Sequence, residues 1–162
     1  MPNIDVGVCL SLGERCEEAA EFYVAIFPGS RIISRSRYGE AGREMHQQRP
    51  GTILAVEFDL SGRRFMALNG PNDRFNQAIS LQIFCDTQEE VDHFWERLTA
   101  GGKPVACGWL EDKYGVSWQV VPRVMGEMLG DFTSPASQRA FVAMMGMVKI
   151  DIAAIRRAYA GA

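Results

Sequence analysis

The sequence predicts an α+β fold in which two βαβββ modules form a cleft and a C-terminal helical extension follows. Three observations predict it. A segment with helical periodicity occurs twice, and each copy lies between an apolar strand candidate and a series of alternating, strand-like segments. Beyond Pro122 the periodicity becomes helical again, without a counterpart in the first module. We expect one domain over residues 1–162, with modules at about 1–70 and 77–122 and the extension at 123–162.

The repeated segment marks the helix of each module. EEAAEFY, from Glu17 to Tyr23, recurs in altered form as EEVDHFW, from Glu89 to Trp95. On a helix that advances about 100° per residue, the large apolar residues of each copy share one face. They are Ala19, Phe22, Tyr23 and Ile26 in the first copy, and Val91, Phe94, Trp95 and Leu98 in the second. Both helices are therefore expected to bury the same stripe.

Alternating apolar and polar residues predict the strands. The first module has them at Val6 to Leu12, Arg31 to Tyr38, Thr52 to Leu60 and Arg63 to Asn69, with the polar stretch Gly39 to Gly51 as a loop. The second module has them at Ala78 to Cys85, Lys103 to Cys107, Trp109 to Asp112 and Val116 to Val121. We expect each module to form an antiparallel sheet with its helix on one face and its other face turned towards the cleft.

The extension is predicted to contain three helices, at Val124 to Leu129, Pro135 to Met147 and Asp151 to Tyr159. We expect it to cover a sheet edge or to pack on a partner subunit, rather than to act in catalysis. Methionines recur in it at helical spacing, and such residues fill irregular cores or subunit contacts. They are Met125, Met128, Met144, Met145 and Met147.

The composition is that of a soluble globular protein, with 47% hydrophobic and 23% charged residues. The net charge of −3 leaves no basic excess to neutralise phosphates, so we expect no nucleic-acid partner. The longest mostly apolar stretch, Ala140 to Val148, is far shorter than the roughly 20 residues that span a bilayer. No pair among the 4 cysteines has the CxxC spacing, which predicts free thiols. We expect a cytoplasmic protein with no membrane partner.

Two segments carry a family resemblance. The run from Cys107 to Pro122, CGWLEDKYGVSWQVVP, and the run from Lys149 to Ile155, KIDIAAI, resemble signatures of the PhnB-like branch of the vicinal oxygen chelate superfamily. This superfamily includes glyoxalase I, bleomycin-resistance proteins, fosfomycin-resistance enzymes and extradiol dioxygenases. Many members of the branch are labelled 3-demethylubiquinone-9 3-methyltransferase. The resemblance implies a glyoxalase-like fold and a homodimer, and, if the chain is an enzyme, it implies methyl transfer.

In metal-dependent members of the superfamily, four strand positions hold a divalent cation with His, Gln or Glu. The resemblance places these positions at Gly7, Ala67, Ser80 and Gln119. Transition-metal sites are built from imidazole, thiolate and carboxylate ligands, and none of these four residues supplies one. We therefore expect no metal. We also expect no other cofactor, because the sequence lacks the Gly-rich strand-to-helix loop that commonly binds S-adenosylmethionine.

The two-residue period places candidate ligand contacts on the cleft side of the strands, and aromatic residues nearby are candidates for stacking. The proposed set is Cys9, Ser11, Tyr38, Asn69, Ser80, Gln82, Trp109 and Gln119. Cys9 is expected to be buried and unreactive, since no residue is evident that would lower its pKa. Gln119 is expected either to bond to Ser80 or Gln82, or to remain free for a ligand.

The two histidines and Trp118 are expected to have no role in ligand binding. His93 should face solvent, opposite the buried stripe of its helix, and Trp118 should face the helix layer. His46 is expected to be an exposed loop residue, with closure over a ligand as the alternative. The sequence thus predicts a small-molecule binding protein with no assigned catalytic residue. A methyltransferase and a structural or regulatory dimer with a vestigial cleft remain the alternatives.

Overall fold

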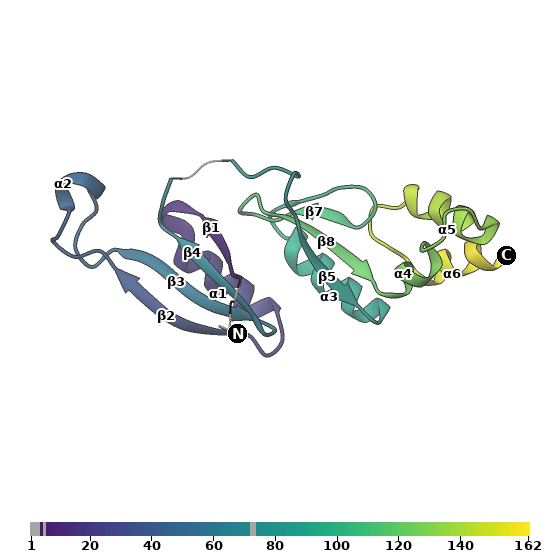
Figure 1. Cartoon of the computed structure of the whole chain (residues 1–162), viewed down its shortest axis with the longest axis horizontal. Helices are drawn as coiled ribbons and strands as arrows, with labels where there is room; N and C mark the ends of the chain where they lie inside the picture. Colours follow the sequence, from purple (N-terminus) through teal and green to yellow (C-terminus); the bar gives the residue numbers. More distant parts are fainter. Residues whose placement is uncertain (1–3, 5, 72–73) are drawn as a thin grey trace. The chain divides into compact units, whose positions relative to one another are not determined.

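The computed structural model describes residue 4 and residues 6–71 and 74–162. The first half contains β1 (Val8–Ser11), the 3-10 helix η1 (Gly13–Arg15), α1 (Cys16–Ile26), β2 (Arg31–Arg37), α2 (Arg43–His46), β3 (Ile53–Leu60) and β4 (Arg63–Leu68). The second half contains β5 (Leu81–Cys85), α3 (Gln88–Thr99), β6 (Lys103–Pro104), β7 (Trp109–Glu111), β8 (Ser117–Pro122), α4 (Val124–Met128), α5 (Pro135–Met145) and α6 (Ile152–Ala160). Figure 1 labels most of these elements. None of the helices described has the length and apolar character needed to cross a bilayer.

The chain divides into two compact units, Met1–Arg74 and Phe75–Ala162. Each contains a 4-stranded sheet with the same topology, β1-β4-β3-β2 in the first unit and β5-β8-β7-β6 in the second. The expected α+β class and the expected repeat are therefore confirmed. Whether the two modules pack as one domain stays a prediction.

The sheets are mixed, which corrects the expectation of antiparallel sheets. β1 pairs with β4, and β5 with β8, in parallel, whereas the other neighbouring strands are antiparallel. The reason lies in the connections. A helical crossover returns the chain in its original direction, and two reversals then bring the fourth strand beside the first strand in that same direction.

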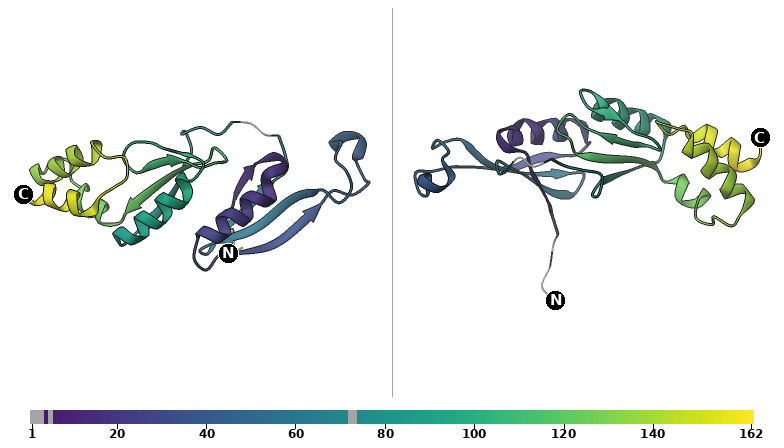
Figure 2. Two further views of the ribbon diagram at one scale, coloured as in Figure 1. Left: turned by 180° about the vertical axis from the view of Figure 1, so that it is seen from behind. Right: turned by 90° about the horizontal axis from the view of Figure 1, so that it is seen from above.

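Helix α1 covers one face of the first sheet (Figure 2). Its Tyr23 is fully buried and stacks on Phe58 of β3, with ring centroids 6.2 Å apart. Arg35 of β2 reaches the same helix and forms ion pairs with Glu17 at 2.7 Å and with Glu21 at 2.9 Å. Within this unit no described helix packs on the opposite face of the sheet, which we call the first open face.

Helix α3 covers the corresponding face of the second sheet. It begins with a capping box, in which the Thr87 side chain accepts from the Glu90 amide and the Glu90 carboxylate accepts from the Thr87 amide. Its buried residues are Val91, Trp95 and Leu98. The expected stripe is thus confirmed, except that Phe22 of α1 and Phe94 of α3 are half-buried. We call the face of this sheet opposite α3 the second open face.

A buried aspartate holds the turn between β7 and β8. Asp112 is 2% exposed, and its Oδ1 accepts from the amides of Tyr114 at 2.8 Å and Val116 at 3.1 Å. Its Oδ2 accepts from the indole nitrogen of Trp118 at 2.8 Å. Trp118 is itself 2% exposed, which confirms its expected place in the core. One carboxylate therefore joins the turn to the packing beneath α3.

The C-terminal helices form a small core of their own at the end of the second unit (Figure 1). It consists of Ala140, Ile150 and Ile155, with Met125, Met128, Leu129, Met144, Met147 and Tyr159 packed against them. This confirms the expected core position for four of the five methionines. Met145 is the exception, since it is 56% exposed.

The segment after α5 is attached to the turn between β6 and β7. The carbonyls of Met147 and Val148 accept hydrogen bonds of 2.8 Å from the amides of Cys107 and Gly108. Helix α5 ends at Met145, two residues before the expected end, and the carbonyls of Met147 and Val148 bond to the β6–β7 turn instead of continuing the helix. The extension thus docks within its own unit.

Candidate functional site

The first open face carries a hollow of about 200 Å³ around Cys9. Cys9 of β1 pairs with Met66 of β4, and Met66 pairs with Glu57 of β3 on its other side. Arg64 forms an ion pair with Glu57 at 3.2 Å. The Cys9 thiol is exposed, so the expectation of a buried cysteine is wrong. The reason is that β1 is an edge strand and Cys9 faces away from α1.

One position implied by the family resemblance lies on the opposite face. Ala67 is fully buried and pairs with Leu10 and Val56. Its neighbour Met66 stands on the open face instead. A shift of one residue reverses the side to which every side chain of a strand points. Apolar residues occupy both faces of β4 near this point, so the alternation could not show which face Ala67 takes.

Three of the expected ligand contacts hold the end of the first sheet together. The hydroxyl of Ser11 donates to the carbonyl of Pro71. Asn69 is 7% exposed, and its side-chain amide donates to the carbonyl of Ile53 at 3.0 Å. The hydroxyl of Tyr38 donates to the carbonyl of Asn69 at 2.9 Å. All three side chains therefore have a structural role in the first unit.

His46 is positioned more firmly than the sequence suggested. The expected loop contains the short helix α2, and the imidazole of His46 lies against the ring of Tyr38 with centroids 4.6 Å apart. Its Nδ1 accepts from the amide of Gln48 at 3.0 Å, so the ring N–H lies on Nε2, which is 3.3 Å from the carbonyl oxygen of Ala41. His93 is also half-buried rather than solvent-facing, with its ring against Phe94.

Strand register arranges the side chains of the second open face in three rows across the sheet. The middle row is Gln82, Gln119 and Trp109, a polar row is Ser117, Glu111 and Lys103, and an apolar row is Phe84 and Val121. Lys103 and Glu111 form an ion pair at 3.0 Å. The face therefore changes from polar to apolar along the strands, with neutral amides in the middle.

Gln119 is hydrogen-bonded on both sides. Its amide nitrogen donates to the hydroxyl of Ser80 at 2.7 Å, and its Oε1 accepts from the amide nitrogen of Gln82 at 3.3 Å. Of the two expectations for Gln119, bonding to Ser80 or Gln82 is the one confirmed, and it holds for both residues. Trp109 lies beside Gln119 in the register and is half-buried. The four expected contacts of this module thus belong to one face, and three of them form one network.

Sequence reasoning missed several charged or polar members of the open faces. Glu57 and Arg64 line the hollow on the first, and Glu111, Lys103 and Ser117 form the polar row on the second. Alternation along the strands could have placed Glu57 and Ser117 on the open faces, because each lies two residues from another open-face position. Nothing in the local sequence predicts which residues pair across neighbouring strands, since that depends on the strand register.

Two of the four thiols are chemically protected by the fold. Burial raises the pKa of Cys85 to about 12, in the same direction as the nearby carboxylates of Glu90 and Asp86. Burial also raises the pKa of Cys16. All four cysteines are free, as expected.

Alkylation of the folded protein with iodoacetamide at pH 8 is expected to modify Cys9 and to spare Cys16 and Cys85. At that pH a thiol of pKa about 12 holds roughly a thousandfold less thiolate than an ordinary cysteine. Peptide mass spectrometry measures the modification, and unfolding in urea should expose all sites equally. Equal labelling of Cys85 and Cys9 before unfolding would contradict the burial described here.

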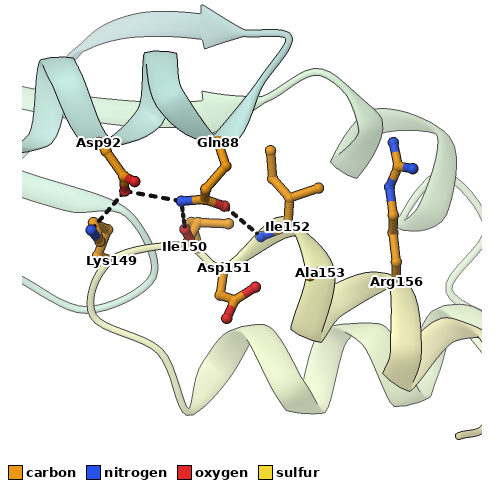
Figure 3. A pocket seen from close by; sticks show the side chains of 8 residues that line it. All are labelled: Gln88, Asp92, Lys149, Ile150, Asp151, Ile152, Ala153 and Arg156. Atoms are coloured by element: carbon orange, nitrogen blue, oxygen red, sulfur yellow. Dashed lines mark hydrogen bonds and ion pairs between the residues drawn. The ribbon is translucent and has the colours of Figure 1, made fainter.

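A larger hollow, of about 470 Å³, lies between α3 and the start of α6 (Figure 3). Gln88 donates to the carbonyl of Ile150 and to Asp92, both at 3.1 Å, and accepts from the amide of Ile152 at 2.9 Å. Lys149 donates to Asp92 at 2.6 Å, and this bond lowers the pKa of the Asp92 carboxyl. These polar groups bond to one another, so we interpret the hollow as the joint that attaches the extension.

In comparisons with known proteins, residues 5–121 match the model of a family described as 3-demethylubiquinone-9 3-methyltransferase. The PhnB protein of Bacillus cereus, whose structure carries the same methyltransferase description, is 34% identical, with 74% of this chain and 99% of that chain covered and a TM-score of 0.64. The match to the family ends before α4, so the helical extension lies outside it.

More distant structures share the fold. The fosfomycin resistance protein FosX of Listeria monocytogenes is 17% identical over 80% of this chain and 98% of its own, with a TM-score of 0.55. FosX of Mesorhizobium loti is 12% identical over 81% of this chain and 100% of its own, with a TM-score of 0.53. No curated protein matches the chain. At these identities the two FosX structures confirm the glyoxalase-like architecture and nothing finer.

Proposed function

Because this chain belongs to the 3-demethylubiquinone-9 3-methyltransferase family, within the vicinal oxygen chelate superfamily, we propose that it binds a small organic molecule without a metal ion. On the second open face the proposed direct contacts are Ser80, Gln82, Trp109 and Gln119. On the first open face the proposed contact is Cys9, and Ser11, Tyr38 and Asn69 would support that face through the bonds they make at the end of its sheet.

The observation that carries this proposal is the hydrogen-bonded Gln119. A glutamine amide held between Ser80 and Gln82 is fixed in orientation before any ligand arrives. Fixed neutral donors and acceptors beside an aromatic ring are typical of sites for small organic molecules. The polar gradient across this face would orient a molecule with one polar and one apolar end.

The residues present do not fit a divalent cation. One structure of Listeria FosX was determined with Mn(II) and sulfate. The superfamily resemblance assigns the metal-binding positions to Gly7, Ser80, Gln119 and Ala67 of β4, whose neighbour Met66 takes the open face, and none of these residues supplies imidazole or carboxylate. In the described part of the chain no three His, Cys, Asp or Glu side chains gather closely enough to hold a metal ion.

The methyl transfer named by the family description would require a methyl donor, and S-adenosylmethionine is the common one. A Gly-rich turn from a parallel strand into a helix usually supplies its site. The connection from β5 to α3 runs through Asp86 and Thr87, and its helical amide at Glu90 is already bonded by Thr87. We therefore propose small-molecule binding as the function, with methyl transfer as the alternative.

Two wider properties belong to the same proposal. We propose a homodimer, as the superfamily resemblance implies, and location in the reducing cytoplasm, where free thiols such as these four persist. Size-exclusion chromatography with light scattering tests the first. A monomer at micromolar concentration would exclude it.

A thermal-shift screen tests the function. The probes are S-adenosylmethionine, a short-chain ubiquinone analogue, bleomycin and Mn²⁺. An organic ligand at one hundred times its Kd adds about 2.7 kcal/mol of stability, which corresponds to a rise in Tm of roughly 5–10 °C. For an organic probe that binds, Gln119→Ala is expected to weaken affinity about five- to tenfold by removing one hydrogen-bonding group. Gln138→Ala, an exposed glutamine of α5, is the matched control.

Each other result selects an alternative. Saturable binding of S-adenosylmethionine would support methyl transfer. A shift with Mn²⁺ that a chelator reverses would overturn the metal-free site. No shift with any probe would support a structural or regulatory dimer whose open faces bind nothing.

A further inference from the structure

Ser117 is the polar side chain on the second open face that the fold leaves unsatisfied. It is 2% exposed, and in the described chain its hydroxyl is the buried side-chain group that has no hydrogen-bond partner. Buried hydroxyls are normally paired, because burying one unpaired costs folding free energy. An unpaired group at this place therefore calls for an explanation.

The position of Ser117 follows from the strand register. In β8 it precedes Trp118, which is buried on the helix side, and it stands two residues before Gln119. It pairs directly with Glu111 of β7. Ser117 therefore belongs to the same face as Gln119 and lies at the polar end of that face.

The neighbours of Ser117 have other partners. The carboxylate of Glu111 is held by Lys103 at 3.0 Å. The hydroxyl oxygen of Ser80 accepts from Gln119 at 2.7 Å. The neighbouring polar groups therefore bond to one another, and the hydroxyl of Ser117 takes part in none of these bonds.

We propose that Ser117 is a specificity-determining contact that donates its hydroxyl proton to an oxygen of an uncharged ligand. This inference rests on the proposed function. The ligand would carry a carbonyl or similar acceptor, because the hydroxyls of Ser117 and Ser80 both offer protons on this side. It would carry no net charge, because Glu111 and Lys103 neutralise each other. A flat ring would lie along the middle row, beside Trp109.

Benzamide is a simple probe with these properties, since it joins a neutral carbonyl to a flat ring. Titration into the full-length 15N-labelled protein, followed by NMR chemical shifts, should move the β8 resonances, with Kd in the millimolar range. Ser117→Ala is expected to weaken this binding about five- to tenfold through loss of one hydrogen bond. In the absence of probe, the same variant is expected to raise Tm by roughly 2–4 °C, because it removes a buried group that has no partner.

Ser80→Ala is the matched control on the same face. Its hydroxyl already has a partner, so its removal leaves the Gln119 amide without an acceptor and should lower Tm. Opposite Tm shifts for the two serines, with weaker benzamide binding in Ser117→Ala, would support the proposal. A fall in Tm for Ser117→Ala would overturn it, since the hydroxyl would then serve the fold itself.

Failure of the inference differs from failure of the proposed function. If benzamide binds the wild type and Gln119→Ala weakens it, but Ser117→Ala binds equally well, the role of Ser117 is overturned while the site stands. If neither benzamide nor any organic probe of the screen binds the wild type, both are overturned.

Discussion

Asp112→Ala is expected to lower the free energy of unfolding by about 3–5 kcal/mol. The substitution removes the acceptor for three donors at once, the amides of Tyr114 and Val116 and the indole nitrogen of Trp118. Each donor left unpaired in a buried site costs about 1–3 kcal/mol, and partial access of water to the turn reduces the total. Because Trp118 lies in the core beneath α3, the loss should affect the whole second unit.

Urea unfolding followed by tryptophan fluorescence measures this effect. Asp131→Ala is the control, because the Asp131 carboxylate also accepts from a following amide, that of Thr133 at 2.9 Å, but it is exposed. Its loss should cost less than about 1 kcal/mol, since water replaces the bond. Equal destabilisation by the two substitutions would show that burial of Asp112 contributes little.

Gly102→Ala is expected to destabilise the protein by at least about 3 kcal/mol. A Cβ atom at this position would lie 2.1 Å from the carbonyl oxygen of Glu111 and 2.8 Å from backbone atoms of Asp112. These are backbone atoms of β7 and of the turn that follows it, and β7 is held by its pairing with β6 and β8. The clash can be relieved only by moving strands apart.

Gly126→Ala provides the control within the same unit. Gly126 lies inside α4, and a Cβ placed there would have no atom within 4 Å other than its chain neighbours and the backbone of its own helix. Alanine should raise stability by about 0.5–1 kcal/mol, because it favours the helix more than glycine does. Thermal unfolding of the two variants should therefore move in opposite directions. A Gly102→Ala protein as stable as the wild type would mean that β6 does not approach β7 as closely as described.

The helical extension lies outside the region that matches the family, and it is attached to that region by hydrogen bonds. The match ends at residue 121, and the chain beyond it returns to α3 through Gln88 and to the β6–β7 turn through Cys107 and Gly108. All these contacts lie within the second unit. The extension therefore supports the helix-facing side of the second sheet and leaves the proposed contacts Gln82 and Gln119 on the opposite face.

Much of the architecture could be predicted from local patterns. The repeated helical segment predicted two modules, because a helix of given periodicity buries the same stripe wherever it occurs. Alternation in β1, β5 and β8 assigned Cys9, Gln82 and Gln119 to the faces opposite the helices, and the structure confirms these faces. These features depend on residues a few positions apart, and this is why the sequence by itself determined them.

Other features depended on contacts between residues far apart in the chain. The period of β4 was ambiguous, so only its pairing with β1 and β3 decided that Ala67 is buried and Met66 is not. The attachment of the extension to α3 also joins distant segments. The unpaired hydroxyl of Ser117 is the clearest case, because a missing partner is visible only when every neighbour is in place. Periodicity determines which side of an element is buried, whereas tertiary packing decides what that side meets.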